Sequence, residues 1–97
     1  MPTYVATVNW TAEGIANFQD SVDRYDAAAG QFEKLGVRFV DAYWTLGEYD
    51  LVVVIEAPDD ESVTAALLQL GAVGNIRTKT MRAFSREEMR GVIEKAA

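Results

Sequence analysis

Three residues around one predicted turn carry functional groups that suit ligand recognition. Gly47, Tyr49 and Asp50 lie within four positions of one another. A tyrosine offers an aromatic face with a hydroxyl, and an aspartate offers an anionic acceptor, so the group could recognise a small ligand. The alternative is structural: Gly47 makes the turn, Tyr49 packs under a helix, and Asp50 caps backbone amides or pairs with an arginine.

A second group of polar side chains lies in the last predicted strand. Arg77, Thr78, Thr80 and Arg82 combine guanidinium forks with hydroxyls, which suits a carboxylate or phosphate of a small ligand. Alternatively, these charges protect a sheet edge or form salt bridges between chains. One of the arginines could also pair with Asp50.

Aromatic residues near the predicted hairpin are the third group. Trp10, Tyr43 and Trp44 could line an aromatic pocket, although such residues more often belong to a core or an interface. We add Asn9 to the candidate ligand-binding residues, because strand alternation predicts that it lies on the same face of the sheet as Tyr43. The predicted ligand-binding residues are Asn9, Tyr43, Gly47, Tyr49, Asp50, Arg77, Thr78, Thr80 and Arg82.

Composition excludes several classes of function. The 97 residues contain no cysteine and no histidine, which removes thiolate nucleophiles, iron–sulfur ligation and the usual nitrogen ligands of zinc. The net charge of −6 disfavours binding to nucleic acid or to anionic lipid. No apolar run approaches a membrane span, and no secretion signal is recognisable, so we expect a cytoplasmic protein.

The acidic run Asp59, Asp60 and Glu61 could be an oxygen-donor metal site. These residues begin a predicted helix, however, where carboxylates complement the positive end of the helix dipole. No phosphate-loop, dinucleotide or catalytic-triad motif is present. We therefore expect no metal and no cofactor.

The elements that must position these residues can be read from hydrophobic periodicity. A strand is predicted over residues 3–9, followed by a helix from Thr11 to about Gly36 with a possible break at 20–21. The apolar stripe of this helix comprises Ile15, Phe18, Val22, Tyr25, Ala29 and Phe32. The remaining elements are strands over 37–45 and 49–57, a helix over 58–74, a strand over 75–83 and a helix over 85–94.

This order, βαββαβ followed by a helix, predicts one α+β domain of the ferredoxin-like type over residues 1–97. Both long helices should cover the same face of the antiparallel sheet. If Gly47 and Glu48 form a two-residue turn, Trp44 pairs with Leu51 on the helix face, and Tyr43 lies on the opposite face. The same alternation places Phe39 on the face opposite the helices.

The strand 51–55 is apolar at odd and even positions alike, whereas a sheet with one wet face should alternate. The chain has too few residues to cover both faces. A second copy is the expected cover, so we predict a homodimer through the sheet face, with larger assemblies possible.

Several short segments resemble the GYD family, small bacterial proteins of uncharacterised function. The matching segments are Trp10–Thr11, Gly14–Ile15, 45–50, 56–60 and 74–84, in which Gly47, Tyr49 and Asp50 correspond to the residues in the family's name. The resemblance implies a ferredoxin-like, dimeric α/β-barrel fold similar to small antibiotic-biosynthesis-type monooxygenases and to ligand-binding domains of leucine-responsive regulators. It implies no established reaction.

The leading functional hypothesis is a regulatory or small-molecule-binding module, with an organic ligand held in a cleft between the sheet and its partner copy. One alternative is a cofactor-independent oxygenase or isomerase, in which Asp50, Tyr43 or Tyr49 provides acid–base chemistry and Arg82 or Asn9 stabilises an oxyanion. Another alternative is a structural assembly subunit with a solid sheet interface.

Overall fold

The computed structural model describes all 97 residues and contains four strands and four α-helices. The elements are β1 (Thr3–Trp10), α1 (Ala12–Ala16), α2 (Ser21–Phe32), β2 (Arg38–Trp44), β3 (Leu51–Glu56), α3 (Asp60–Val73), β4 (Ile76–Ala83) and α4 (Arg86–Ala96). Short 3₁₀ turns over Phe18–Asp20 and Glu33–Leu35 flank α2.

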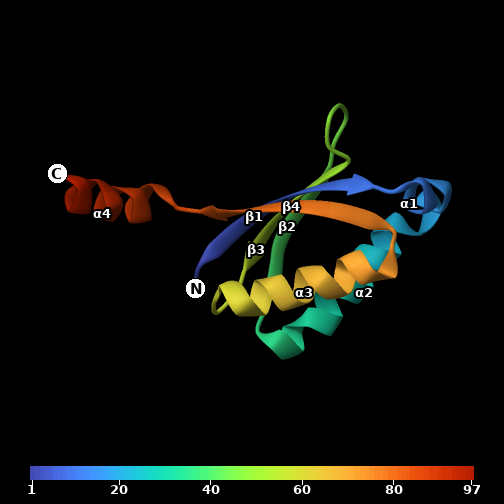
Figure 1. Cartoon of the computed structure of the whole chain (residues 1–97), viewed down its shortest axis with the longest axis horizontal. Coiled ribbons are helices and arrows are strands. Elements are labelled where there is room, and N and C mark those ends of the chain that lie inside the picture. The colour runs from blue at the N-terminus through green and yellow to red at the C-terminus, as the bar shows by residue number, and fades with distance from the viewer.

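The strands form one antiparallel sheet in the order β2-β3-β1-β4. Helices α2 and α3 lie together on one side of this sheet, beneath it in Figure 1. The order and the single helical layer are the ferredoxin-like arrangement, so the predicted α+β fold is confirmed. Strand β4 is an edge strand, as its charges indicated.

The core lies between the sheet and the two helices. Alternate residues of the central strands point toward the helices: Tyr4, Ala6, Val8, Leu51, Val53 and Ile55 are all at most 6% exposed. Phe32 of α2 and Val63 of α3 close the core from the helical side. Ala66 of α3 is also buried, and Leu67 and Leu70 of the same helix pack against the core.

The first helix is interrupted, but the non-helical residue is Asn17, ahead of the predicted break at 20–21, and a 3₁₀ turn follows it before α2 begins. This interruption resets the helical phase, so the predicted stripe is only half right. Tyr25 and Phe32 pack on the sheet, whereas the side chains of Ile15, Phe18 and Val22 are about half exposed. Ser21 and Ala28 are buried on the inner side of α2, positions that the stripe did not include.

The hairpin between β2 and β3 has the predicted register but a longer loop. Trp44 pairs with Leu51, and Tyr43 pairs with Val52, as expected. The loop is closed by the Thr45 amide, which donates to the Asp50 carbonyl over 2.8 Å. Thus four residues, 46–49, connect the pair rather than two.

Phe39 lies on the helix face, and its predicted position on the opposite face is wrong. A β-bulge between Phe39 and Asp41 inserts one residue into β2, which inverts the alternation on its far side. Phe39 therefore pairs with Ile55, and its ring stacks 5.5 Å from that of Tyr25.

Helix α1 is fixed against the start of β4 by close backbone contacts. The Thr11 hydroxyl caps the helix by accepting from the Gly14 amide and donates to the Gly74 carbonyl over 2.6 Å. The Thr11 amide donates to the Asn75 carbonyl. A Cβ atom on Gly14 would lie 1.9 Å from that carbonyl oxygen, so only glycine fits here.

Helix α4 leaves the body of the domain beyond the end of β4 (Figure 1). It begins with a capping box between Ser85 and Glu88, at the start of the predicted helix over 85–94, but none of its residues is buried. The side chains of Met89, Val92 and Ile93 are 39–58% exposed, as is Phe84 just before the helix at 52%.

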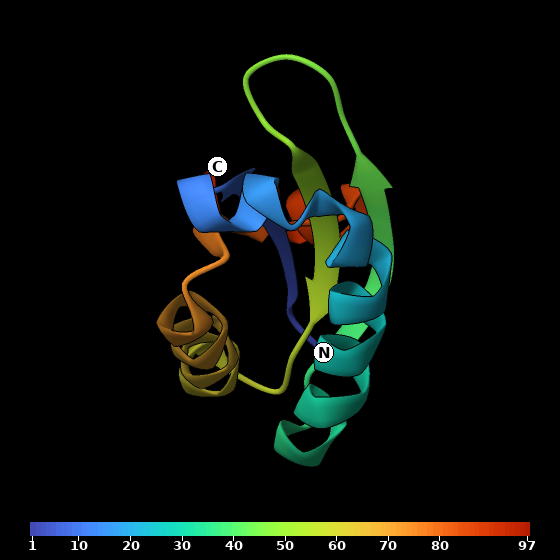
Figure 2. The same ribbon diagram turned by 90° about the vertical axis from the view of Figure 1, so that its right-hand side faces the viewer.

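No element covers the face of the sheet opposite α2 and α3, which we call the open face (Figures 1 and 2). Val5, Val52 and Val54 lie at its centre and are half-buried by their strand neighbours alone. Strand β3 therefore has two apolar sides, as expected. Leu51, Val53 and Ile55 face the helices, whereas Val52 and Val54 lie on the open face. None of the helices is long and apolar enough to span a membrane.

Candidate functional site

Asp50 links the hairpin to the end of β1. Its Oδ2 accepts the Trp10 amide over 2.9 Å, and its own amide donates to the Val8 carbonyl over 2.9 Å. The bond to the Trp10 amide agrees with the structural alternative for Asp50, in which its side chain caps a backbone amide. Its carboxylate is therefore already engaged by the chain.

The neighbouring predicted residues also build the hairpin. The Asn9 side-chain amide donates to the Glu48 carbonyl over 2.8 Å, and the Thr45 hydroxyl donates to the Tyr49 carbonyl over 2.6 Å. Gly47 has a φ of +103°, which a side chain would strain. The loop presents Leu46, which is fully exposed, at the projecting end of the hairpin.

Tyr43 and Arg77 lie on the open face, on opposite edge strands. Tyr43 is 58% exposed, and its hydroxyl donates to Asp41 over 2.9 Å. That bond, together with the charge of Asp41, raises the pKa of the Tyr43 phenol. Arg77 pairs with Asn9 across the strands and is exposed.

Thr78, Thr80 and Arg82 lie on the helix face, since they pair with Val8, Ala6 and Tyr4, respectively. The nine predicted residues are thus divided among the two faces of the sheet and the loop between β2 and β3, and they do not form one site. Thr80 contributes a buried hydroxyl that has no hydrogen-bond partner.

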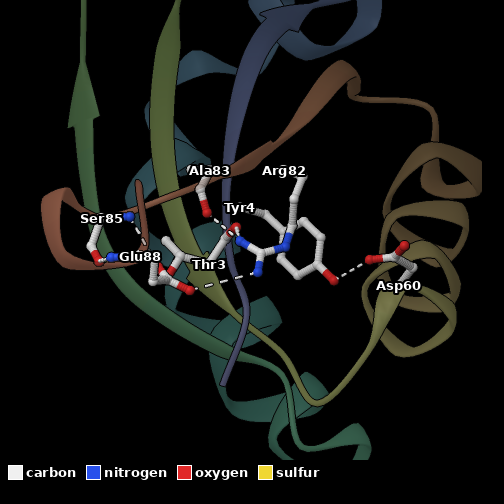
Figure 3. Close-up of polar contacts among 7 residues, drawn as sticks. All are labelled: Thr3, Tyr4, Asp60, Arg82, Ala83, Ser85 and Glu88. Carbon is white, nitrogen blue, oxygen red and sulfur yellow. Dashed lines mark hydrogen bonds and ion pairs between the residues drawn. The ribbon is translucent and has the colours of Figure 1, made fainter. Parts of the chain in front are cut away.

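Arg82 is the centre of a polar cluster that joins four elements (Figure 3). Its guanidinium lies 5.7 Å from the centre of the Tyr4 ring and 4.6 Å from that of Phe84. It donates to the carbonyls of Thr3 and Ala83 and pairs with the Glu88 carboxylate over 3.7 Å. Arg82 therefore connects the edge of the sheet to the start of α4.

Tyr4 and Asp60 complete this cluster. The Tyr4 hydroxyl donates to Asp60 in the first turn of α3, which raises the pKa of the phenol. An open cleft of about 270 Å³ lies beside them, lined in part by Thr80 and Arg82. No local sequence pattern links Tyr4 to Asp60, because the two residues are 56 positions apart.

The acidic run at the start of α3 is engaged in capping. The Asp59 carboxylate accepts the Ser62 amide over 2.8 Å, and this bond lowers the pKa of Asp59. Asp60 accepts from Tyr4. No group of three or more acidic residues is placed to hold a metal ion.

A separate, mainly apolar cavity of about 220 Å³ lies on the helix side, between α2 and α3 and the sheet. Figure 2 shows the two helices set apart over the same face of the sheet. Fourteen of the 19 lining residues are hydrophobic, among them Trp10, Tyr25, Leu51, Leu67 and Leu70. The sequence carried no signal of this cavity, because its existence depends on the separation of two helices that are distant in the chain.

Arg24 is the only charged residue that lines this cavity. Its Nη1 donates to the Asn17 carbonyl over 2.8 Å, whereas its Nη2 is buried and has no partner. Nearby, the Trp44 indole donates to the buried Ser21 hydroxyl over 3.0 Å. The cavity therefore combines an apolar wall with one unsatisfied cationic donor.

Comparison with models of known protein families identifies the family of this chain. The model of the GYD domain matches residues 4–93, nearly the whole sequence. The chain belongs to the GYD family. The resemblance noted from the segments around Trp10, Gly47 and Gly74 is thereby confirmed.

One relative of this GYD protein and one solved structure of similar fold come from Thermus thermophilus. The protein named "Glutamine synthetase and cystathionine beta-lyase binding protein" is 34% identical over 85 residues, which cover 87% of this chain and 90% of the relative. The crystal structure of TTHA0845 superposes with a TM-score of 0.56 at 22% identity, covering 88% of this chain and 95% of that one. The similarity to the TTHA0845 structure supports the ferredoxin-like fold of this chain.

Gly47 and Asp50, which correspond to residues in the family's name, make structural contacts within the hairpin and with β1. Gly47 makes the turn, and Asp50 ties the hairpin to β1. Trp10 and Thr11 meet Asp50, Gly74 and Asn75 at the same end of the sheet through hydrogen bonds. Segments far apart in the sequence thus form one structural junction.

Proposed function

We propose that this GYD protein is a binding module that forms a homodimer through its open face and docks onto a metabolic enzyme. The observation that carries the proposal is the apolar centre of the open face, at Val5, Val52 and Val54, over which the chain places no element. A contiguous apolar surface of this kind is characteristic of an interface.

Charge distribution favours a second copy as the cover of the open face. The β4 edge presents Arg77 and Lys79, whereas the side formed by β2 and β3 presents Asp41 and the ion pair of Glu56 with Arg38, which leaves that side net negative. Two sheets related by a two-fold axis can place the basic edge of one copy over the acidic side of the other. Residues such as Asn9 and Tyr43 then lie within the interface, where a cleft between the sheets would hold any ligand bound there.

The enzyme partner is proposed from the relative that is named for binding glutamine synthetase and cystathionine beta-lyase. Two features of this chain suit protein docking: the projecting hairpin with its fully exposed Leu46, and helix α4 with its exposed Met89, Val92 and Ile93. Exposed apolar side chains on projecting elements are typical anchors of protein interfaces.

The alternative of a cofactor-independent enzyme receives less support. Its proposed acid–base and oxyanion groups lie on two faces of the sheet, and Asp50 and Asn9 are already bonded to backbone groups. Tyr43 donates to Asp41, and its raised pKa makes it a weaker acid at neutral pH. We therefore favour a binding role.

The enzyme partner can be tested by biolayer interferometry. Glutamine synthetase and cystathionine beta-lyase of the source organism are immobilised separately, with an unrelated enzyme of similar isoelectric point as the control surface. We expect saturable binding to at least one of the two enzymes. Leu46→Ser should weaken that binding by about tenfold, as truncation of an interface anchor does.

Glu33→Gln serves as the matched variant, because Glu33 is exposed in the 3₁₀ turn that follows α2. The C-terminal end of α2 lies far from the hairpin loop (Figure 1). It should bind like the wild type. Binding of neither enzyme above the control surface, at concentrations where the protein is dimeric, would refute the enzyme-docking part of the proposal.

A further inference from the structure

The cavity between α2 and α3 opens partly to solvent and is larger than the gaps that ordinary packing leaves. Protein interiors are packed about as densely as organic crystals, and voids larger than a water molecule are few. The cavity here measures about 220 Å³ and lies over the central strands β1 and β3, on the side away from the proposed dimer interface. An apolar cavity of about 150 Å³ is known to hold a benzene molecule, so this one has room for a ring with a short substituent.

Arg24 determines which kind of molecule suits the cavity. Its Nη2 is buried without a hydrogen-bond partner, and the residue forms no ion pair. A buried donor without a partner costs free energy, and the cost is larger when the group is charged. An anionic acceptor at this position would remove that cost with a charge-assisted hydrogen bond.

The charge of the rest of the protein strengthens this selection. The chain carries a net charge of −6, so a free anion is repelled unless it finds a specific cationic contact. The remaining polar lining, which includes Asn75 and Thr78, is neutral, and the walls are mainly apolar. A molecule that fits must therefore combine an apolar body with one negative group.

We propose that this cavity binds a small monocarboxylic acid with an aromatic ring or a short aliphatic chain, its carboxylate on Arg24 and its apolar body against Leu51, Leu67 and Leu70. The site is separate from the open face and from the projecting hairpin, so it does not depend on the proposed docking function. It provides a route by which a metabolite could act on a binding module of this kind.

The test is a calorimetric titration of the 97-residue protein with benzoate, 3-phenylpropionate and hexanoate. The matched neutral probes are benzamide, 3-phenylpropionamide and hexanamide, which have nearly the same shape. We expect at least one acid to bind saturably and its amide to bind at least tenfold more weakly. Amide shifts in a ¹H–¹⁵N spectrum should be concentrated in α2, α3 and the helix-facing residues of β1 and β3.

Two variants separate a specific site from a general effect of charge. Arg24→Gln should weaken binding of the acid at least tenfold while leaving binding of the amide unchanged. Arg38→Gln removes an exposed arginine that pairs with Glu56 on β3, and it should bind the acid like the wild type.

The proposal is overturned if no acid in the panel binds saturably, or if acids and amides bind equally. Equal losses in Arg24→Gln and Arg38→Gln would also overturn it, because they would indicate attraction to net charge. If Arg24→Gln fails to fold by circular dichroism, the comparison of acid with amide on the wild type still decides.

Discussion

At the scale of single residues, the polar groups that looked most functional serve to hold the chain together. Asp50 accepts the Trp10 amide, and Asn9 donates to the Glu48 carbonyl. Thr11 bonds to the backbone of Gly74. These bonds join the hairpin, β1 and α1 at one end of the sheet, which gives physical roles to the segments that identify the family.

Gly14 should tolerate no side chain. Its Cβ would lie 1.9 Å from the Asn75 carbonyl oxygen, so Gly14→Ala must displace backbone and should destabilise the protein by about 1–3 kcal/mol. Gly30→Ala is the matched control, because no atom outside the local backbone of α2 and the two chain neighbours lies within 4 Å of the added methyl group. It should stabilise by about 0.5–1 kcal/mol, since alanine favours helix. Urea unfolding curves measure both, and equal effects would contradict the contact.

The Asp59 cap predicts a pH dependence. Its bond to the Ser62 amide lowers the pKa of Asp59 below the ordinary value of 3.8. The contribution of the cap to stability is therefore complete above that value and is lost as the pH falls through the lower, folded pKa. Asp59→Asn keeps a capping side chain without the titration.

The urea midpoint of Asp59→Asn should therefore fall less between pH 5 and pH 2.5 than that of the wild type. Glu61→Gln, in the same turn of α3 without a cap bond, should follow the wild type. A parallel decline in Asp59→Asn and wild type would show that the cap does not titrate as described.

At the scale of elements, α4 is the helix whose stability is least explained by contacts with the rest of the domain. An isolated helix of its length, 11 residues, is marginal in water even with good capping. Glu88, paired with Arg82, is the only residue of α4 that forms an ion pair with the body of the domain. Its apolar residues must therefore gain a partner surface if the helix is to be stable.

Hydrogen exchange measures this dependence directly. Amides of residues 86–96 should exchange at least tenfold faster than those of β1 in dilute protein, because local opening exposes no buried surface. If α4 packs on the second copy, raising the protein concentration should slow their exchange, while β1 is unaffected. Exchange in α4 as slow as in β1 at every concentration would mean that the helix is stable without a partner.

At the scale of the whole molecule, the sheet has one face under helices and one face open. Val53 and Val54 are consecutive in β3 but face opposite sides, and their environments differ accordingly. Val53 is 6% exposed beneath the helices, whereas Val54 is half-buried opposite Val5 and Asp41 on the open face. A substitution at Val53 therefore tests folding, whereas a substitution at Val54 tests assembly.

Val54→Lys should yield a folded monomer. The lysine ammonium can reach water beside Asp41 in a single copy, but it would be buried between two sheets. Light scattering should give twice the chain mass of 10.7 kDa for the wild type and 10.7 kDa for the variant, with an unchanged circular dichroism spectrum. Val53→Lys should instead unfold the chain. A wild-type protein that is monomeric at working concentration would contradict the dimer.

Most of the element order was predictable because its signals are local. Caps at Thr11 and Ser85 and the pairing of Trp44 with Leu51 depend on residues close to one another in the chain. The period of 3.6 or 2 in the apolar residues does not require knowledge of distant contacts. The ferredoxin-like order of the sheet follows from these elements and the short connections between them.

The sequence by itself thus determined the elements and the family, while the tertiary structure decided which side chains meet. One extra residue in β2 moved Phe39 to the other face, because a strand repeats every two residues and any insertion inverts it. The bond from Tyr4 to Asp60 and the cavity beside Arg24 depend on how two helices, far apart in the chain, settle on one sheet. Such distances are fixed by packing of the whole domain, and no local pattern encodes them.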